Sequence, residues 1–376
     1  MSQVKRALVA FGKKNAVMVV ALLAAVGTAF LVPPDAGYLG YFDVKTLACL
    51  FCVLAVVGAL KNIRFFYLLA RQIVRLFHTT RSAILALVTI TFIGSMLIAN
   101  DMALLTFLPL GYFVLSATDK TSYMAFTFIL QNIAANLGGM LTPFGNPQNL
   151  YLYTRFSIPT GEFMSILLMP FLLAVTAITV CCLLLPAEPL YLEEQPLSLP
   201  KGRTALYLAL FLLAIAIVFR GIPYWVGLIV VPGVLLVADR KALREVDYPL
   251  LLTFVFFFIF SGNLARLAPV RAFFSALLEK NTVLVSILSC QCISNVPTAI
   301  LLSQFTDRYA ELLIGVNIGG VGTLVASLAS LITYREYLRH NPGQNLYYLR
   351  LFTLFNVGFL VLLTGGTMLY RALIGG

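Results

Sequence analysis

Apolar residues run along this chain in long blocks that are separated by short polar segments. A helix that crosses a lipid bilayer needs about 20 mostly apolar residues. The blocks that can supply such helices cover residues 16–32, 43–60, 121–153, 161–186, 204–219, 222–238, 248–262, 309–333 and 350–371. The pattern therefore predicts an all-α polytopic membrane protein with about nine spans.

Two further apolar blocks, 83–116 and 282–306, are interrupted near their middle by polar residues. Asn100-Asp101 interrupts the first block, and Ser294-Asn295 followed by Pro297 interrupts the second. Irregular backbone at membrane depth is tolerated only when it is buried in protein or lines a cavity. We therefore predict two re-entrant hairpins, each made of two short helices that enter and leave on the same side.

A basic amphipathic stretch precedes each predicted hairpin. Residues 63–79 place Arg64, Arg71 and Arg75 on one helical face, and residues 264–280 mix basic, aromatic and aliphatic side chains in a similar way. Such helices typically lie in the membrane interface. An additional span is the alternative for residues 63–79.

The two halves of the sequence resemble each other. Residues 136–142 read Asn-Leu-Gly-Gly-Met-Leu-Thr, and residues 317–323 read Asn-Ile-Gly-Gly-Val-Gly-Thr. Both halves show the same order of spans, interfacial helix, hairpin and interrupted helix, and the extra span at 204–219 starts the second copy on the opposite side. This order predicts inverted repeats, a common architecture of secondary transporters. The repeats cover residues 1–186, with scaffold helices at 16–60, and residues 204–376, with a cytoplasmic linker at 187–203 between them.

Composition and charge agree with a membrane protein. The chain is 60% hydrophobic and only 11% charged, whereas soluble domains carry about 25% charged residues. The net charge of +11 does not indicate nucleic-acid binding, because the Lys and Arg residues gather in short loops beside the spans. Their excess on one side predicts a cytoplasmic N-terminus and a C-terminus outside.

Motifs for catalysis and nucleotide binding are missing from the sequence. It contains no G-x-x-x-x-G-K-[ST] string, so we expect no ATP-driven partner, and we expect neither an enzyme nor a metal centre beyond a Na⁺ site. Cys49 and Cys52 have the spacing of a redox or metal motif. Because they lie within an apolar span, we interpret them as packing residues, with redox or metal chemistry as the alternative.

The string Thr142-Pro-Phe-Gly-Asn-Pro-Gln-Asn149 lies inside an otherwise apolar span. Its prolines remove backbone donors, Gly145 permits unusual backbone angles, and Asn146-Pro147 is typical of an N-cap followed by the first residue of a new helix. Unwound carbonyls at 142–145 can ligate a cation, and the N–H groups after Asn146 can hold an anion. The alternative is a proline kink in a continuous helix.

A second candidate break covers residues 319–330, which are rich in glycine and hydroxyl groups and include Thr323 and Ser327. Its alternative is close helix packing, because Gly315 and Gly319 form a G-x-x-x-G motif. The two breaks are predicted to face each other from oppositely oriented halves. Peptide dipoles and carbonyls would then supply most of the binding.

Asp101 is the single carboxylate deep within a predicted hairpin. A charged side chain at that depth costs about 2.5–3.5 kcal/mol or more. We therefore expect Asp101 to bind a cation, to cap a helix, or to carry a proton. Both hairpin tips, Asn100-Asp101 and Ser294-Asn295, have the composition of helix N-caps.

At these motifs the chain resembles the ion transporter superfamily, which includes arsenite permeases, NhaD-type sodium/proton antiporters, citrate–metal carriers and divalent anion/sodium symporters. The resemblance is carried by Asn100-Asp101 with Ala103-Leu104, by residues 142–149, and by residues 294–297, and it is greatest for short bacterial permeases of the YbiR type. It implies an elevator-type homodimer in a bacterial inner membrane, without a cofactor but with Na⁺ or H⁺ as the coupling ion. The residues implied to bind the cation are Asn100, Asp101, Thr142, Gly145, Asn146, Asn295, Thr298, Thr323 and Ser327. The residues implied to bind the substrate are Asn100, Asp101, Asn146, Pro147, Asn149, Ser294, Asn295, Pro297 and Ser327.

These observations favour a secondary active transporter that moves a small carboxylate or inorganic oxyanion. The alternative is a cation/proton antiporter or an arsenite-type exporter that uses Asp101 as its coupling carboxylate. A channel without coupling is a third possibility, although paired broken helices are typical of carriers.

Overall fold

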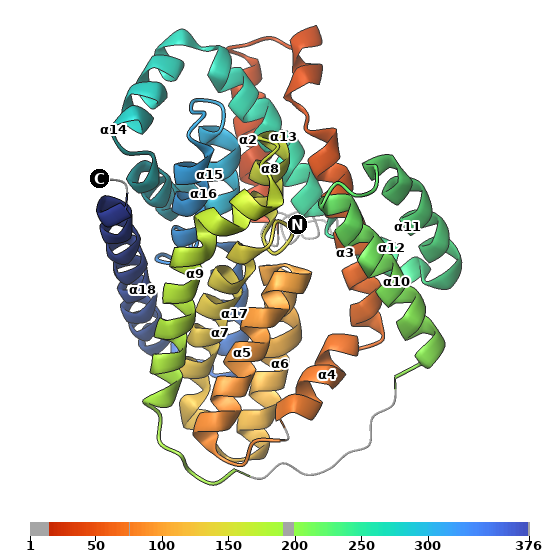
Figure 1. The fold of residues 1–376 in the computed structure, drawn as a ribbon, viewed down its shortest axis with the longest axis vertical. Coiled ribbons are helices and arrows are strands. Elements are labelled where there is room, and N and C mark those ends of the chain that lie inside the picture. Colours follow the sequence, from red (N-terminus) through yellow and green to blue (C-terminus); the bar gives the residue numbers. More distant parts are fainter. Residues whose placement is uncertain (1–14, 75, 191–198, 375–376) are drawn as a thin grey trace, which may run out of the picture.

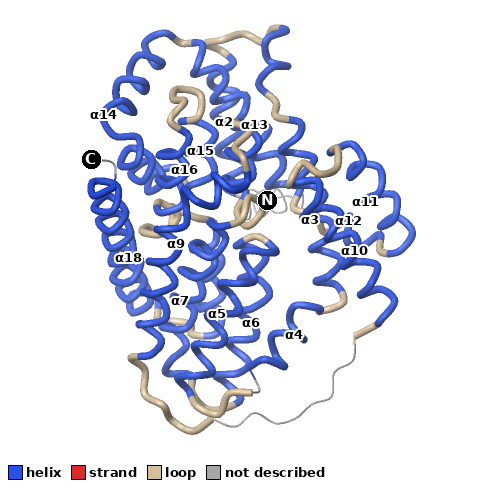
Figure 2. The backbone as a smooth tube through the Cα atoms, viewed as in Figure 1, coloured by secondary structure: helices blue, strands red, loops and turns tan. Residues whose placement is uncertain are grey.

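The computed structural model describes residues 15–74, 76–190 and 199–374, and within these ranges every regular element is a helix (Figure 2). The prediction of an all-α protein is therefore confirmed for the described part of the chain. Nine helical segments there are long and apolar enough to cross a membrane. They are Val44–Asn62, Thr80–Ile98, Asn100–Ala117, Thr121–Leu141, Thr160–Leu183, Lys201–Val218, Arg240–Arg266, Ala268–Ile293 and Asn345–Leu373.

The number of candidate spans agrees with the sequence-based prediction, but some of the segments that form them differ from the predicted ones. Three expected spans are helices of fewer than 18 residues: α2 (Ala16–Ala29), α11 (Tyr224–Ala238) and α16 (Tyr309–Ile318). Conversely, helices that were assigned to hairpins reach spanning length. One reason is that a capping box formed by Thr79 and Ser82 starts α5 (Thr80–Ile98) three residues before the predicted block.

Helices α3 (Val44–Asn62) and α4 (Phe65–Val74) meet at a corner near Arg64, whose φ is 56°. Within the described part of the predicted interfacial helix at 63–79, the helix that continues past the corner is α4, which has ten residues. Ten residues rise about 15 Å, which is half the thickness of the hydrocarbon core. The alternative that 63–79 is a further span is therefore wrong.

The remaining helices of the first half follow in sequence. They are α5, α6 (Asn100–Ala117), η2 (Thr121–Tyr123), α7 (Met124–Gly138), η3 (Gly139–Leu141), α8 (Pro147–Arg155) and α9 (Thr160–Leu183), with the short η1 (Ala36–Tyr41) between α2 and α3. Helical structure thus stops between Leu141 and Pro147, as the proline-rich string predicts. A single residue, Ala99, separates α5 from α6.

The second half contains α10 (Lys201–Val218), α11, α12 (Arg240–Arg244), α13 (Tyr248–Arg266), α14 (Ala268–Ile293), α15 (Asn295–Leu302), α16, α17 (Leu328–His340) and α18 (Asn345–Ile374). The predicted helix at 264–280 corresponds to the first part of α14, which begins at Ala268 and is separated from the second part by a kink at Asn281. Asn281 has non-helical angles and kinks α14 there, and its side chain accepts a hydrogen bond from Leu284 N at 2.9 Å. The kink coincides with the predicted start of the second hairpin at 282.

In Figure 1, α7 lies within the bundle formed with α5, α6, α9 and α17. The segment Thr121–Leu141 is 89% buried inside the protein, whereas the spans of α9 and α18 are 28% buried. Helix α7 packs against α5, α6 and α17, and the α10–α11 pair packs on α3 at one side of the molecule. The more polar of the two breaks, at residues 142–149, therefore directly follows the most buried of these segments.

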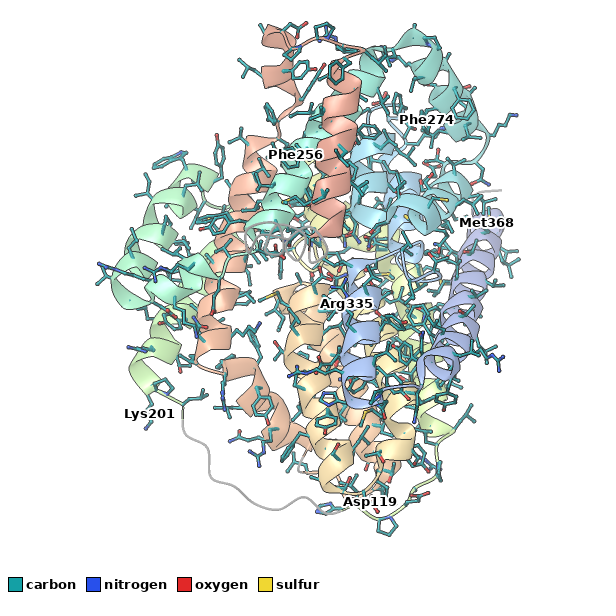
Figure 3. All side chains as sticks on the ribbon, turned by 180° about the vertical axis from the view of Figure 1, so that it is seen from behind. Asp119, Lys201, Phe256, Phe274, Arg335 and Met368 are labelled. Carbon is teal, nitrogen blue, oxygen red and sulfur yellow. The ribbon has the colours of Figure 1, made fainter. Side chains whose placement is uncertain are left out.

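The ends of the molecule can be followed in the side-chain view. In Figure 3, Asp119 in the α6–α7 turn and Lys201 at the start of α10 lie toward one end, and Phe274 of α14 lies toward the other. Between α9 and α10, Glu188 contacts the first of these ends, because its carboxylate accepts hydrogen bonds from Lys120 Nζ and Tyr123 Oη. The described part of the predicted linker is therefore attached to the bundle of α5, α6 and α7.

Candidate functional site

A small cavity lies where the α5–α6 tip faces the start of α8. Its volume is about 60 Å³. The residues that line it are Leu50, Val53, Leu54, Ala99, Asn100, Asp101, Met102, Leu105, Phe144, Pro147, Leu150, Asp247, Leu250, Leu328 and Ile332. They come from α3, α6, α8, α13 and α17 and from the first break, so both halves of the chain contribute. We call this space the tip cavity.

The tip between α5 and α6 is built by an unusual backbone conformation. Ala99 has φ 63° and ψ 150° and serves as the N-cap of α6, so neither Asn100 nor Asp101 occupies that position. The prediction that Asn100-Asp101 supplies the cap is wrong by one residue, because the reversal takes place at Ala99. Asn100 is the first helical residue, and its side-chain oxygen accepts a hydrogen bond from Asp101 N at 2.9 Å.

The carboxylate of Asp101 lacks a full set of partners in the described structure. Its Oδ1 atom is buried and accepts no hydrogen bond there. Asp247, the N-cap of α13, lines the same cavity. Among residues 15–74, 76–190 and 199–374, no Lys, Arg or His lines the cavity. The described lining therefore combines two carboxylates without a fixed positive charge.

The first break is held open by asparagine side chains. Asn149 Nδ2 donates to the carbonyls of Gly139 and Met140 at 3.1 and 3.2 Å, and Asn146 Nδ2 donates to Asn136 O at 3.1 Å. These carbonyls lose their helical partners where α7 ends. The two asparagines thus satisfy carbonyls that are left unpaired where α7 and η3 end.

Asn146 and Pro147 occupy the positions that the sequence predicts. Asn146 is the N-cap of α8, with φ −138° and ψ 143°, and Pro147 is the first helical residue. The Asn146 side chain does not cap the helix, and its Oδ1 is buried without a hydrogen-bond partner in the described structure. An acceptor in that state has capacity for a ligand.

The second tip and the second break form a similar arrangement. Ser294 is the N-cap of α15, with φ 73° and ψ 158°, and Ser327 is the N-cap of α17, with φ −148° and ψ 143°. The tip docks on the break, because Asn295 N donates to Ala326 O at 2.9 Å. Pro297 and Thr298 follow within the first turns of α15, and Thr298 Oγ1 is buried without a described partner.

Hydrogen bonds at the two breaks match pairwise. Thr142 Oγ1 donates to Met96 O at 2.7 Å, and Thr323 Oγ1 donates to Gln291 O at 3.1 Å. Met96 and Gln291 each lie four residues before the asparagine of their tip. The two threonines are the last residues of the matching strings 136–142 and 317–323. In each half of the chain, therefore, a threonine of the break donates a hydrogen bond to a carbonyl just before the tip.

Buried amides from both halves of the chain lie around Gly320. Asn100 Nδ2 donates to Asn136 Oδ1 at 3.2 Å. A methyl group built on Gly320 would lie 3.7 Å from Asn136 Oδ1 and 3.2 Å from Asn295 Nδ2. Asn317 Nδ2 donates to Asn149 Oδ1 at 2.7 Å and so links the second break to the first. The two tips and the two breaks thus converge around Gly320.

The structure brings most of the predicted site residues to two adjoining places. Asn100, Asp101 and Pro147 line the tip cavity, and Thr142, Gly145, Asn146 and Asn149 surround the first break behind it. The members of the second group, Ser294, Asn295, Pro297, Thr298, Thr323 and Ser327, belong to the second tip and break and do not line the cavity themselves. Only Leu328, next to Ser327, reaches the cavity from the second break.

Sequence reasoning missed several residues of this centre. Asp247 lies one residue before the predicted span 248–262 and was not considered, although it lines the tip cavity. Gln291 donates to the carbonyls of Gly319 and Val321 and accepts from Thr323 N at 2.8 Å. Its position four residues before the tip was the available signal. Asn132, whose amide lies 3.4 Å from Ser330 Oγ and from Asn356 Oδ1, gave no signal beyond being polar within a span.

Comparisons with known proteins agree with a transporter architecture. Residues 7–311 match the family model described as citrate transporter. The "Uncharacterized transporter MJ0456" of Methanocaldococcus jannaschii is 30% identical over 296 residues, which cover 77% of this chain and 80% of that protein. "Inner membrane protein YbiR" of Escherichia coli is 28% identical over 324 residues, which cover 84% of this chain and 86% of that protein.

Proposed function

Because this chain belongs to the citrate transporter family of the ion transporter superfamily, we propose that it moves a small anion, such as citrate, together with Na⁺ or H⁺. Family membership makes it a membrane transporter and not an enzyme. The observation that carries the finer proposal is the tip cavity. There the start of α6, the start of α8 and the start of α17 meet beside two carboxylates.

The charges in the cavity argue for coupling to a cation. An anion placed near Asp101 and Asp247 is repelled by both carboxylates, and the cavity lining offers no basic side chain in compensation. A bound Na⁺ or a proton on one carboxylate cancels one of the two negative charges and so weakens this repulsion. The N-terminal N–H groups of α6 and α8 then favour the anion. Symport follows, because the anion binds well only when the cation is also present.

The matched contacts of the two tips support an inverted repeat with two re-entrant hairpins, α5–α6 and the second part of α14 with α15. One cation would be held by Asn100, Thr142, Gly145 and Asn146. The other would be held by Ser294, Asn295, Thr298, Thr323 and Ser327. Buried oxygens without partners at Asn146 and Thr298 supply one unused ligand in each group.

The size of the cavity supports an alternating-access cycle. About 60 Å³ holds an ion or a few water molecules, whereas sites for small organic molecules usually measure about 300–1,000 Å³. The cavity must therefore widen to admit citrate. We propose that α5–α8 and α14–α17 move together against α3 and α13, as in an elevator, within a homodimer. The N-terminus would lie in the cytoplasm of a bacterial cell.

A cation/proton antiporter or an arsenite-type exporter is the second candidate. It is favoured by the same two carboxylates, because a cavity without basic side chains suits a cation better than an anion. In that reading Asp101 exchanges a proton for the transported cation. No separate anion is needed at the site.

Uptake of labelled citrate into proteoliposomes tests the two readings. We expect uptake that rises with an imposed inward gradient of Na⁺ or H⁺, that is lost in Asp101→Asn, and that persists in Asp307→Asn, an exposed carboxylate away from the cavity. Cation-driven collapse of a pH gradient without citrate uptake would favour the antiporter. If neither citrate nor cations move under any gradient, the proposal fails.

A further inference from the structure

A second, larger groove lies between the α3–α4 corner and α6. Its volume is about 390 Å³, and it is open on one side. It is lined by Lys61, Arg64, Phe66, Tyr67, Leu105, Thr106 and Pro109. The first four come from the corner and the last three from α6. We call it the basic groove.

Among the described residues that line it, the groove holds two cations and no carboxylate. Within the described ranges, neither Lys61 nor Arg64 lies in an ion pair. The nearby carboxylate of Asp239 is already engaged, because it accepts from Asn62 Nδ2 at 3.1 Å and from Ala242 N at 3.2 Å. The two positive charges are therefore left to interact with whatever enters the groove.

The chemistry of this lining selects an oxyanion. Arginine and lysine bind carboxylate and phosphate groups through charge-assisted hydrogen bonds. The hydroxyl of Thr106 donates to Met102 O at 2.8 Å, so recognition depends on the two cations. Phe66 and Tyr67 line the apolar part of the groove. The volume fits a small organic anion, since it falls within the range of about 300–1,000 Å³ that is usual for such sites.

The groove adjoins the tip cavity. Leu105 lines both spaces, and its side chain is 44% exposed. Along α6, the eight helical steps from Asp101 to Pro109 span about 12 Å. An anion held by Lys61 and Arg64 therefore lies close to the carboxylates of the tip cavity. Leu105 lies between the basic groove and the tip cavity.

We propose that the basic groove binds a carboxylate or phosphate group and that the transported anion occupies this site immediately before it enters the tip cavity. The route depends on the proposed transport function, whereas oxyanion binding in the groove does not. The cations attract the anion where no carboxylate repels it. Passage into the tip cavity then requires the accompanying Na⁺ or proton.

Mixed-disulfide formation at a cysteine placed in the groove tests the binding without any transport assay. Thr106→Cys is treated with the anionic reagent sulfonatoethyl methanethiosulfonate and with its cationic trimethylammonioethyl analogue. Modification is followed on the peptide that carries residue 106, so the native thiols do not interfere. Leu105→Cys provides a second probe position. Lys61→Gln with Arg64→Gln removes the groove charges, and Lys201→Gln with Arg203→Gln, both exposed on α10, is the matched control.

The anionic reagent should react faster than the cationic one, and this preference should fall by about tenfold when the groove charges are removed, but not in the control. Citrate or inorganic phosphate should slow the reaction in the protein with intact charges. A lipid headgroup would be identified as the oxyanion by two results together. The reaction of the cysteine would be slower in nanodiscs of phosphatidylglycerol than in nanodiscs of phosphatidylcholine, and citrate would have no effect on its rate. Equal rates for both reagents, with no protection by citrate, phosphate or phosphatidylglycerol, would overturn the proposal. Failure of citrate uptake with intact protection would overturn the transport function alone.

Discussion

A single methyl group at Gly145 should destabilise the first break. A Cβ atom at this position would lie 2.4 Å from Gly139 O and 2.8 Å from Gly139 Cα, and also 2.6 Å from Thr142 Oγ1. Two of these contacts involve backbone, so the methyl group can be accommodated only if residues 139 and 145 separate. The carbonyl of Gly139 accepts from Asn149 Nδ2 at 3.1 Å, and this bond would lengthen as well.

The magnitude follows from these two effects. Overpacking of a well-packed interior costs about 1–3 kcal/mol. Weakening of one buried hydrogen bond adds about 0.5–1.5 kcal/mol. We therefore expect Gly145→Ala to lower the free energy of unfolding by about 2–4 kcal/mol. Gly358→Ala in α18 meets nothing within 4 Å and should be neutral or slightly stabilising.

Thermal unfolding in detergent provides the assay. Cys49, Cys52, Cys182 and Cys290 are buried, so a thiol-reactive dye reports the loss of structure, and Cys292→Ser removes the exposed thiol from the background. The midpoint of Gly145→Ala should fall by several degrees relative to that of Gly358→Ala. Equal midpoints would show that the chain is not closely packed at the break, and the reasoning about the site would fail.

Two further predictions concern contacts away from this glycine. Asn317→Ala should lower stability by about 1–3 kcal/mol in the same assay, because the buried Asn149 Oδ1 loses the amide that donates to it at 2.7 Å; an unchanged midpoint would contradict a link between the two breaks. The hydrogen bonds from Lys120 and Tyr123 lower the pKa of Glu188 below its ordinary 4.5, so its contribution to stability is present above that pH and is lost as the pH falls through the folded-state pKa. Glu188→Gln should therefore unfold at a lower temperature than the wild type at pH 7, and the difference should disappear well below pH 4.5; a difference that persists in acid would contradict this assignment.

The two interruptions could be predicted because they are encoded locally. Pro143 and Pro147 end one helix and begin the next through backbone chemistry alone, and the structure places the N-cap of α8 at Asn146 as expected. The polar pairs at 100–101 and 294–295 located both tips to within a residue. The exact cap was missed at the first tip, because Ala99 adopts the positive φ that a sequence pattern assigns to glycine or asparagine.

Contacts between distant segments could not be predicted in this way. Asp247 reaches the tip cavity only through the packing of α13 beside α3, and Asn132 meets Asn356 across 224 residues. The prediction of which apolar blocks form spanning helices was partly wrong for a related reason. Hydropathy marks apolar blocks, whereas helix length depends on caps and breaks such as the box at Thr79 and the interruption after Ile318.

Ligand-dependent stability of Gly320→Ala tests most directly whether the two proposed cation groups, whose tips and breaks converge around Gly320, support binding in the adjoining tip cavity. The added methyl group would lie 3.2–3.7 Å from Asn295, Asn317 and Asn136, a tight but tolerable fit, so the unliganded variant should unfold close to the wild type. We predict that citrate with Na⁺ or at acidic pH raises the unfolding midpoint of the wild type and of Gly358→Ala but leaves that of Gly320→Ala unchanged. Full stabilisation of Gly320→Ala by citrate would contradict a binding site at this centre.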